Sequence, residues 1–175
     1  MKFFLLILLL FSFSVSALKE SEISFVYELL ENKSNFYQLG NFKNTTGNQL
    51  KYAQFGTTKG KKGSVVFVSG FGENIFKYLE FFYDLNALGY SPIYTYDHVG
   101  QGFSESLLEN TEFGYIDSYT TYVKDLDLFL KQIVLKNSEV DSDHLFLTSH
   151  SMGSLVSALY LEENSNTFQA AVLSS

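Results

Sequence analysis

Hydrophobic and polar residues follow different periods in different parts of the chain. At residues 36–39 and 50–55 apolar and polar residues alternate one by one, and a turn-rich segment at 44–48 separates the two stretches. Alternation at this period is typical of strands with one buried face, so we predict an antiparallel hairpin. From residue 65 onwards the pattern changes to continuous apolar runs that are separated by helical stripes.

Apolar runs without alternation are found at residues 65–68, 93–96, 145–147 and 168–173. Such runs are expected in a parallel sheet that is covered on both faces. Between them, apolar residues recur every three or four positions, which predicts helices with one buried face. These stripes span residues 75–85, 118–136 and 155–161. Alternation of strand and helix predicts the α/β class, with a doubly wound, mostly parallel sheet.

The first 17 residues have the pattern of a secretory signal peptide. Lys2 precedes an apolar stretch at 3–13, and Val15 and Ala17 are small residues at the positions that signal peptidase reads. The apolar stretch is shorter than the ~20 residues that a membrane-spanning helix needs. We therefore predict an exported protein, periplasmic or secreted, with an uncleaved anchor as the alternative.

The chain is expected to divide into a signal peptide at residues 1–17, a polar segment at 18–35 and one main domain at 36–175. A short helix is expected at residues 23–31. No internal repeat or linker interrupts the main domain, and its length is sufficient for one hydrophobic core.

The composition argues against several classes of function. The net charge is −7 and all twelve basic residues are lysines, which argues against a nucleic-acid partner. The chain has no cysteine, so disulfides and thiolate chemistry are excluded. Its three histidines are His98, His144 and His150, too few for a histidine-rich metal centre. We expect no metal and no cofactor.

The stretch 145–155 carries the strongest chemical signal. Small and polar residues separate its apolar run from the helix that follows, and Ser151 stands at the apex. This layout is typical of a nucleophile elbow, a strand-to-helix turn that exposes its central side chain. Gly153 provides the small residue that the crowded turn needs, whereas Ser149 fits less well than glycine would. The alternative is a serine-rich helix cap without chemistry.

The loop at residues 69–73 follows the first buried strand. Gly70 and Gly72 flank Phe71, so the backbone can turn sharply and direct an N–H group inward. A nucleophile elbow needs a second oxyanion donor from such a loop. The alternative is a glycine-rich connection that binds no ligand, and no Gly-Lys-Ser/Thr follows that would indicate a phosphate loop.

The loop at residues 97–104 follows the next strand. Gly100 and Gly102 indicate a tight turn, and Asp97 is expected to hydrogen-bond to the backbone of this loop. Asp97 and His98 could be mistaken for catalytic partners of Ser151. Because adjacent residues diverge at a strand end, we predict a structural role for both.

These three segments, 69–73, 97–104 and 149–153, resemble in order and spacing the lysophospholipase and monoacylglycerol lipase-like branch of the α/β-hydrolases (serine aminopeptidase S33-type). The similarity extends over about residues 36–175. It implies Ser151 as the nucleophile, with the backbone N–H groups of Phe71 and Met152 as the oxyanion hole. Residues implied to support the site are Gly70, Gly72, Asp97, Gly100, Gly102 and Gly153. The implied substrates are lipid-like carboxylic esters, such as lysophospholipids or monoacylglycerols. Transient contact with a membrane surface is a further expectation.

The sequence departs from the family pattern at four positions. Serine stands at position 69, where the family usually has histidine, and valine stands at position 99, where it often has arginine. Ser149 and Ser154 replace glycines that are frequent in the family. The first two differences could loosen the oxyanion loop, but the backbone donors do not depend on those side chains.

The acid and the histidine of a catalytic triad are not found after the nucleophile. In this fold they follow the serine along the chain. The 24 residues after Ser151 contain two acidic residues, Glu162 and Glu163, and no histidine. Both glutamates are expected at the end of the elbow helix, and His150 stands beside the nucleophile rather than across from it. A serine without a general base is a poor nucleophile.

We therefore expect this chain to be the N-terminal part of a serine ester hydrolase, without the lid and the last strands, and to be inactive alone. An open sheet edge and poor solubility are expected as well. The alternatives are a catalytically dead remnant or non-catalytic binding protein of the same fold, and a peptidase or short-chain esterase of the same superfamily. The oligomeric state is not predicted.

Overall fold

The computed structural model describes residues 36–109, 115–116 and 118–175. In chain order its elements are β1 (Tyr37–Lys43), β2 (Gln49–Phe55), β3 (Gly63–Val68), α2 (Leu79–Ala87), β4 (Tyr90–Tyr96), α3 (Tyr119–Gln132), two short 3₁₀ turns (Val134–Lys136 and Ser142–His144), β5 (Leu145–His150), α4 (Met152–Glu163) and β6 (Ala170–Ser174). The predicted signal peptide, the polar segment and the helix at 23–31 lie outside the described residues.

The six strands form one sheet in the order β1-β2-β4-β3-β5-β6. β1 and β2 form the predicted antiparallel hairpin, and β2 joins β4 in antiparallel orientation. β4, β3, β5 and β6 run parallel to one another. The fold class is therefore confirmed, and β3, in which every residue is buried, lies in the interior of the sheet.

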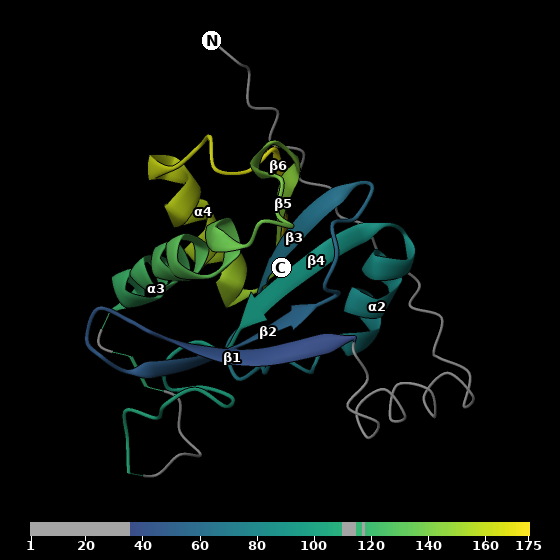
Figure 1. Cartoon of the computed structure of the whole chain (residues 1–175). Coiled ribbons are helices and arrows are strands. Elements are labelled where there is room, and N and C mark those ends of the chain that lie inside the picture. The colour runs from purple at the N-terminus through teal and green to yellow at the C-terminus, as the bar shows by residue number, and fades with distance from the viewer. Residues whose placement is uncertain (1–35, 110–114, 117) are drawn as a thin grey trace.

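Helices cover both faces of the sheet, with α2 on one side and α3 and α4 on the other (Figure 1). Successive residues of a strand point to opposite faces, so β3 serves two cores at once. Val66 and Val68 pack towards α3 and α4, whereas Val65 and Phe67 pack towards α2. This double burial explains why the strand has no polar face.

Several helix and strand ends differ from the sequence prediction. α2 begins at Leu79 rather than near residue 75, because the residues before it form turns, with the Lys77 N–H bonded to the Asn74 carbonyl. The predicted helix at 118–136 ends at Gln132 and continues as a 3₁₀ turn. α4 begins directly after Ser151 rather than at residue 155. In the described part of the chain, no helix combines the length and apolar character needed to cross a membrane.

Candidate active site

Ser151 joins the end of β5 to the first residue of α4. Its backbone has φ 50° and ψ −122°, and it is the one residue other than glycine with a positive φ in the described part of the chain. Such a conformation is unfavourable for a residue with a Cβ and is found mostly at functional sites. The Ser151 side chain is exposed, and its hydroxyl has no hydrogen-bond partner among the described residues. The serine is thus held outward at the start of a helix.

Gly153 lies in the first turn of α4, where the helix passes close to β3. A Cβ at this position would overlap the carbonyl oxygens of Val68 and Ser69. The backbone crowding that the sequence pattern predicted is therefore present, and only glycine fits. The close approach lets α4 begin immediately above the end of the sheet.

The serines that replace family glycines bond to each other. The Ser149 hydroxyl, on buried β5, donates to the Ser154 hydroxyl at 3.2 Å, and Ser154 donates to the Ser174 carbonyl at 2.6 Å. The buried Ser149 hydroxyl thereby has a hydrogen-bond acceptor, where an unpaired hydroxyl would be unfavourable. The turn accommodates both substitutions without losing its geometry.

The loop after β3 lies against the elbow. A Cβ placed on Gly70 would be 3.1 Å from the Ser151 Cβ, and Gly72 has φ +71°. The Phe71 side chain is 59% exposed, and its N–H has no acceptor among the described residues. Met152 is the first residue of α4, where a helix leaves its N–H groups without intrahelical partners. Neither of the two predicted oxyanion donors therefore has an acceptor in the part of the chain that the structure describes.

Glu73 closes this loop with a carboxylate that is almost completely buried. Its Oε2 accepts from the Gly70 N–H at 2.6 Å. Its Oε1 lies 2.6 Å from Lys77 Nζ, 2.9 Å from the Tyr78 hydroxyl and 3.1 Å from His150 Nδ1. Burial alone would raise the pKa of Glu73, but donation by Lys77, Gly70 and Tyr78 holds it below its ordinary value. The group is an ionised carboxylate at neutral pH.

His98 supports the same loop from beneath. The His98 ring is buried, and its Nε2 lies 3.0 Å from the Ser69 carbonyl oxygen. A carbonyl can only accept, so Nε2 carries the proton. Burial lowers the pKa of His98 to about 4, and the ring is neutral at physiological pH. It acts as a fixed donor to the loop, in agreement with the predicted structural role.

Asp97 organises the loop after β4, as predicted. Its Oδ2 accepts from the Phe103 N–H at 2.7 Å, and a Cβ on Gly102 would overlap the carboxylate. Burial raises the pKa of Asp97 to about 6. Gly100 also has a positive φ, and a Cβ there would lie 2.8 Å from the Tyr115 carbonyl oxygen. None of the hydrogen bonds described for Asp97 or His98 reaches Ser151.

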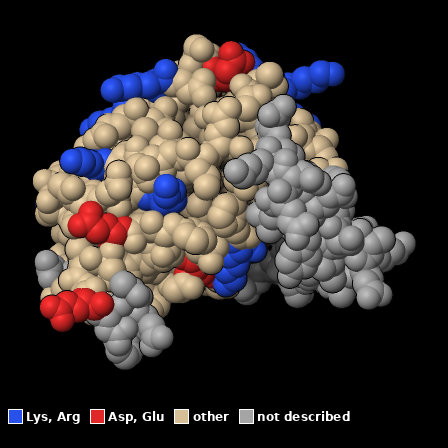
Figure 2. All heavy atoms as spheres, turned by 60° about the horizontal axis from the view of Figure 1, so that its bottom comes forward, with Lys and Arg blue, Asp and Glu red and all other residues tan. Residues whose placement is uncertain are grey.

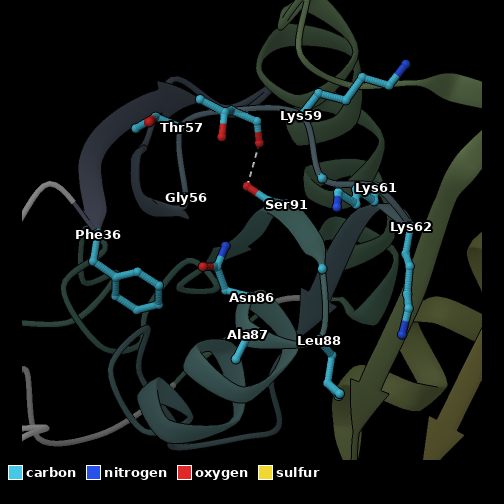
Figure 3. A pocket seen from close by; sticks show the side chains of 13 residues that line it. Phe36, Gly56, Thr57, Lys59, Lys61, Lys62, Asn86, Ala87, Leu88 and Ser91 are labelled. Atoms are coloured by element: carbon cyan, nitrogen blue, oxygen red, sulfur yellow. Dashed lines mark hydrogen bonds between the residues drawn. The ribbon is translucent and has the colours of Figure 1, made fainter.

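A pocket of about 650 Å³ lies at the opposite end of the sheet (Figure 3). It is lined by the turns before β3 and β4, where the Ser91 hydroxyl donates to the Thr58 carbonyl at 2.6 Å. Lys59, on its rim, is paired with Asp141 at 3.0 Å. The parallel strands begin at this end, so the pocket is remote from the elbow.

Charged side chains are scattered over the face shown in Figure 2 rather than gathered into one patch. Within the described ranges no group of three or more histidine, aspartate or glutamate side chains could hold a metal ion.

Glu73 and Gln101 contribute to the site, although sequence reasoning assigned no role to either. Gln101 Oε1 accepts from the Gly72 N–H at 2.6 Å, and its Nε2 donates to the Tyr122 hydroxyl at 2.8 Å. The available signal was their position, because each is a long polar residue in a glycine-containing loop after a buried strand. Their partners are distant in sequence and become neighbours only in the fold.

A mostly parallel sheet with an exposed serine on a strained strand-to-helix turn defines the α/β-hydrolase class. Comparison with known protein families agrees with this assignment. The family model described as serine aminopeptidase, S33 matches residues 59–175, and the chain belongs to this family.

Curated relatives are lipid hydrolases by name. The chain is 32% identical over 111 residues to a probable lysophospholipase L2 of Haemophilus influenzae and 34% identical over 109 residues to lysophospholipase L2 of Escherichia coli. These matches cover 63% and 62% of this chain and 34% and 31% of the relatives. A monoglyceride lipase homolog of Monkeypox virus is 34% identical over 113 residues, covering 64% of this chain and 38% of that protein. The chain thus spans about a third of the length of these relatives.

Solved structures show the same fold. A thermostable carboxyl esterase of Bacillus coagulans, in complex with glycerol, has a TM-score of 0.65 at 24% identity, covering 78% of this chain and 43% of the esterase. A thioesterase domain from the curacin biosynthetic pathway has a TM-score of 0.62 at 21% identity, and the match covers 79% of this chain and 46% of the thioesterase domain. At this level of identity the likeness concerns the fold alone.

Proposed function

We propose that this chain carries the nucleophile and the oxyanion hole of a serine ester hydrolase that acts on lipid-like carboxylic esters. The observation that carries the proposal is the backbone of Ser151, strained at φ 50° and ψ −122° between β5 and α4 with its hydroxyl exposed. Strain of this kind persists only where the surrounding structure enforces it. The names of the curated relatives support lysophospholipids or monoacylglycerols as substrates.

The reaction begins when the Ser151 oxygen attacks the ester carbonyl carbon. The new C–O bond displaces the carbonyl π electrons onto oxygen, and the N–H groups of Phe71 and Met152 donate to this oxyanion. A general base takes the serine proton and passes it to the departing alcohol as the ester C–O bond breaks. Water then attacks the carbonyl carbon of the acyl-enzyme, and the base takes its proton and returns it to the Ser151 oxygen. The carboxylic acid leaves and Ser151 is free again.

The acid and base of this reaction belong, in our proposal, to polypeptide beyond the 175 residues. No histidine follows Ser151. Glu162 and Glu163 end α4, away from the strand ends where the site is located. Without a base to activate Ser151, the 175 residues alone are expected to turn over little ester.

Exposed aromatic rings support an apolar substrate. Phe71 and Phe103 are 59% and 58% exposed, and both lie on loops after parallel strands, the end of the sheet where Ser151 is found. Apolar rings in these positions suit contact with an acyl chain or, transiently, with a lipid surface. No cofactor takes part in the proposed chemistry.

The test uses a fluorophosphonate, which phosphonylates activated serines. The complete natural product that contains these residues should be labelled at Ser151, and Ser151→Ala should abolish labelling. Ser154→Ala, a serine of the same turn, is the control and should retain labelling. Labelling that persists in Ser151→Ala would remove Ser151 as the nucleophile.

A non-catalytic protein of the same fold is the second candidate. The downstream reading frame discriminates between the two: an Asp followed by a His after further strands supports the enzyme, whereas a stop codon supports the non-catalytic protein. A peptidase or short-chain esterase is distinguished by hydrolysis assays on peptide, short-chain and lipid esters.

We also propose that the protein is exported, with residues 1–17 as its signal peptide. The support is the sequence pattern of Lys2, the apolar stretch and Ala17. Expression in a secreting host should give a mature protein that begins at Leu18, as measured by intact mass. Ala17→Arg should block processing, and an unprocessed cytoplasmic product of the parent sequence would contradict the proposal.

A further inference from the structure

Three consecutive backbone amides of the loop after β3 differ in how they are bonded. The Gly70 N–H donates to Glu73 Oε2 at 2.6 Å, and the Gly72 N–H donates to Gln101 Oε1 at 2.6 Å. The N–H of Phe71, between them, has no acceptor in the part of the chain that the structure describes. Side chains thus occupy the two outer amides and leave the central one available for a ligand.

Glu73 also connects this loop to the nucleophile elbow. Its second oxygen, Oε1, lies 3.1 Å from Nδ1 of His150, the residue before Ser151. The carboxylate cannot donate, so the proton between them belongs to His150. The Tyr78 hydroxyl, which donates to Glu73, also lies 2.9 Å from His150 Nδ1. Glu73, together with Tyr78, therefore connects the oxyanion loop to the elbow, and the relative position of the two depends on this contact.

The negative charge of Glu73 lies close to the site where an oxyanion would develop, which by itself would be unfavourable. A Cβ on Gly70 would be 3.1 Å from both the Glu73 carboxylate and the Ser151 Cβ. Lys77 offsets this charge, since its Nζ lies 2.6 Å from Oε1. The Tyr78 hydroxyl donates to the same oxygen at 2.9 Å. The carboxylate can therefore orient the loop without repelling a negatively charged intermediate.

Gln101 is held in one orientation. Its amide nitrogen donates to the Tyr122 hydroxyl on α3 at 2.8 Å, so its carbonyl oxygen must face Gly72. Gln101 and Tyr122 are both buried, which limits competition from water. α3 thereby supports the loop through Tyr122 and Gln101.

We propose that Glu73 and Gln101 are positioning residues that bind the amides of Gly70 and Gly72 and so present the Phe71 N–H to the oxyanion. Neither side chain touches substrate; both act through the loop backbone. The inference rests on the proposed function, because it assigns the free amide to the oxyanion of a serine hydrolase. It adds the means by which the donor is oriented.

Hydrogen exchange of single amides tests the arrangement without relying on activity. It is measured on the complete natural product by mass spectrometry with electron-transfer fragmentation. Glu73→Gln should accelerate exchange at Gly70 by roughly tenfold or more and leave exchange at Gly72 unchanged. Gln101→Met should accelerate exchange at Gly72 and leave exchange at Gly70 unchanged. Loss of global stability would accelerate both amides together, so this crossed pattern is specific to positioning. Unchanged exchange at Gly70 in Glu73→Gln would overturn the proposal.

Labelling kinetics test the consequence for the site. Loss of one oxyanion donor lowers rates by about 10²–10³-fold. We expect Glu73→Gln to lower the maximal rate of fluorophosphonate labelling of Ser151 by roughly 10- to 100-fold, with half-saturation within about twofold of the parent. Glu80→Gln is the matched control, since Glu80 has the same charge and its side chain makes no hydrogen bond among the described residues. It should label at the parent rate.

Two outcomes separate this inference from the function on which it rests. A parent protein that is not labelled at Ser151 would overturn the proposed function and the oxyanion role together. A labelled parent with an equally fast Glu73→Gln variant would overturn only the positioning role. Should Glu73→Gln fold poorly, Glu73→Asp keeps the charge but is one methylene shorter. It should also release Gly70, and retained protection there would equally overturn the proposal.

Discussion

The backbone N–H of Ser151 donates to the carbonyl oxygen of Ser174 at 2.8 Å, so the nucleophile elbow is hydrogen-bonded to the end of β6. The same carbonyl accepts from the Ser154 hydroxyl at 2.6 Å. One main-chain oxygen therefore holds both the turn and the first residues of α4. The strained conformation of Ser151 is enforced by this bond on one side and by the close approach of Gly153 to β3 on the other.

Gly153→Ala should destabilise the protein and displace α4, because the new methyl group would overlap the carbonyl oxygens of Val68 and Ser69. Overpacking of this kind typically costs about 1–3 kcal/mol. Urea unfolding measures the loss. Gly47→Ala is the control, since a Cβ there has no neighbour within 4 Å and only the positive φ is unfavourable. Equal losses at the two positions would contradict the packing argument.

The bond between Ser149 and Ser154 should appear as a coupling energy. Ser154→Ala leaves the buried Ser149 hydroxyl without its acceptor, so we expect a loss of about 1 kcal/mol in the free energy of unfolding. Ser149→Ala should lose less, because Ser154 retains the Ser174 carbonyl. A double-mutant cycle should give a coupling of at least about 0.5 kcal/mol. Strictly additive losses would mean that the pair does not compensate for the missing glycines.

Asp125, on α3, should make stability fall with rising pH. The side chain is fully buried, and neither carboxylate oxygen has a hydrogen-bond partner among the described residues. Burial raises the pKa of Asp125 to about 7. The unfolded chain releases the proton near the ordinary pKa of 3.8, whereas the folded chain keeps it until about pH 7. Stability is therefore lost between these two values.

Asp125→Asn should remove that pH dependence, which amounts to at most about 1.4 kcal/mol per pH unit. The variant should gain stability relative to the parent as the pH rises from 4 to 7, with no further gain above pH 7. Urea unfolding at several pH values measures this difference. Asp127→Asn, a more exposed aspartate of the same helix that pairs with Lys131, is the control and should leave the slope in place. If the free energy of unfolding depended on pH in the same way in the parent and in Asp125→Asn, the prediction would be wrong.

When the 175 residues are expressed alone, β6 should be a site of self-association. It pairs with β5 on one side, and no described strand pairs with its other edge. The strand carries no charge or proline, the features that usually protect an edge, and Val172 is 64% exposed. Val172→Lys should reduce aggregation in light scattering without changing the far-UV circular dichroism. Val123→Lys, on half-buried α3 surface, is the contrast and should lower stability instead.

Much of the architecture could be predicted because it depends on local patterns. The apolar run of β3 predicted a strand covered on both faces, and Val65 and Val66 do pack into opposite cores. The small residues around Ser151 predicted a sharp turn, and its backbone has the positive φ of such a turn. Helix starts were predicted less well, since apolar Ile75 continues the stripe of α2 although it lies in the turn before it.

The strand and helix order, the hairpin and the elbow could be predicted from the chain alone, because the hydrophobic period and the placement of glycines depend on a few neighbouring residues. What surrounds the elbow depends instead on how distant segments pack. Glu73 and His150 are 77 positions apart, and Gln101 and Gly72 are 29 apart. Their contacts exist because parallel strands bring their carboxyl ends to one edge of the sheet, and no local pattern in the chain records which loop side chains meet there.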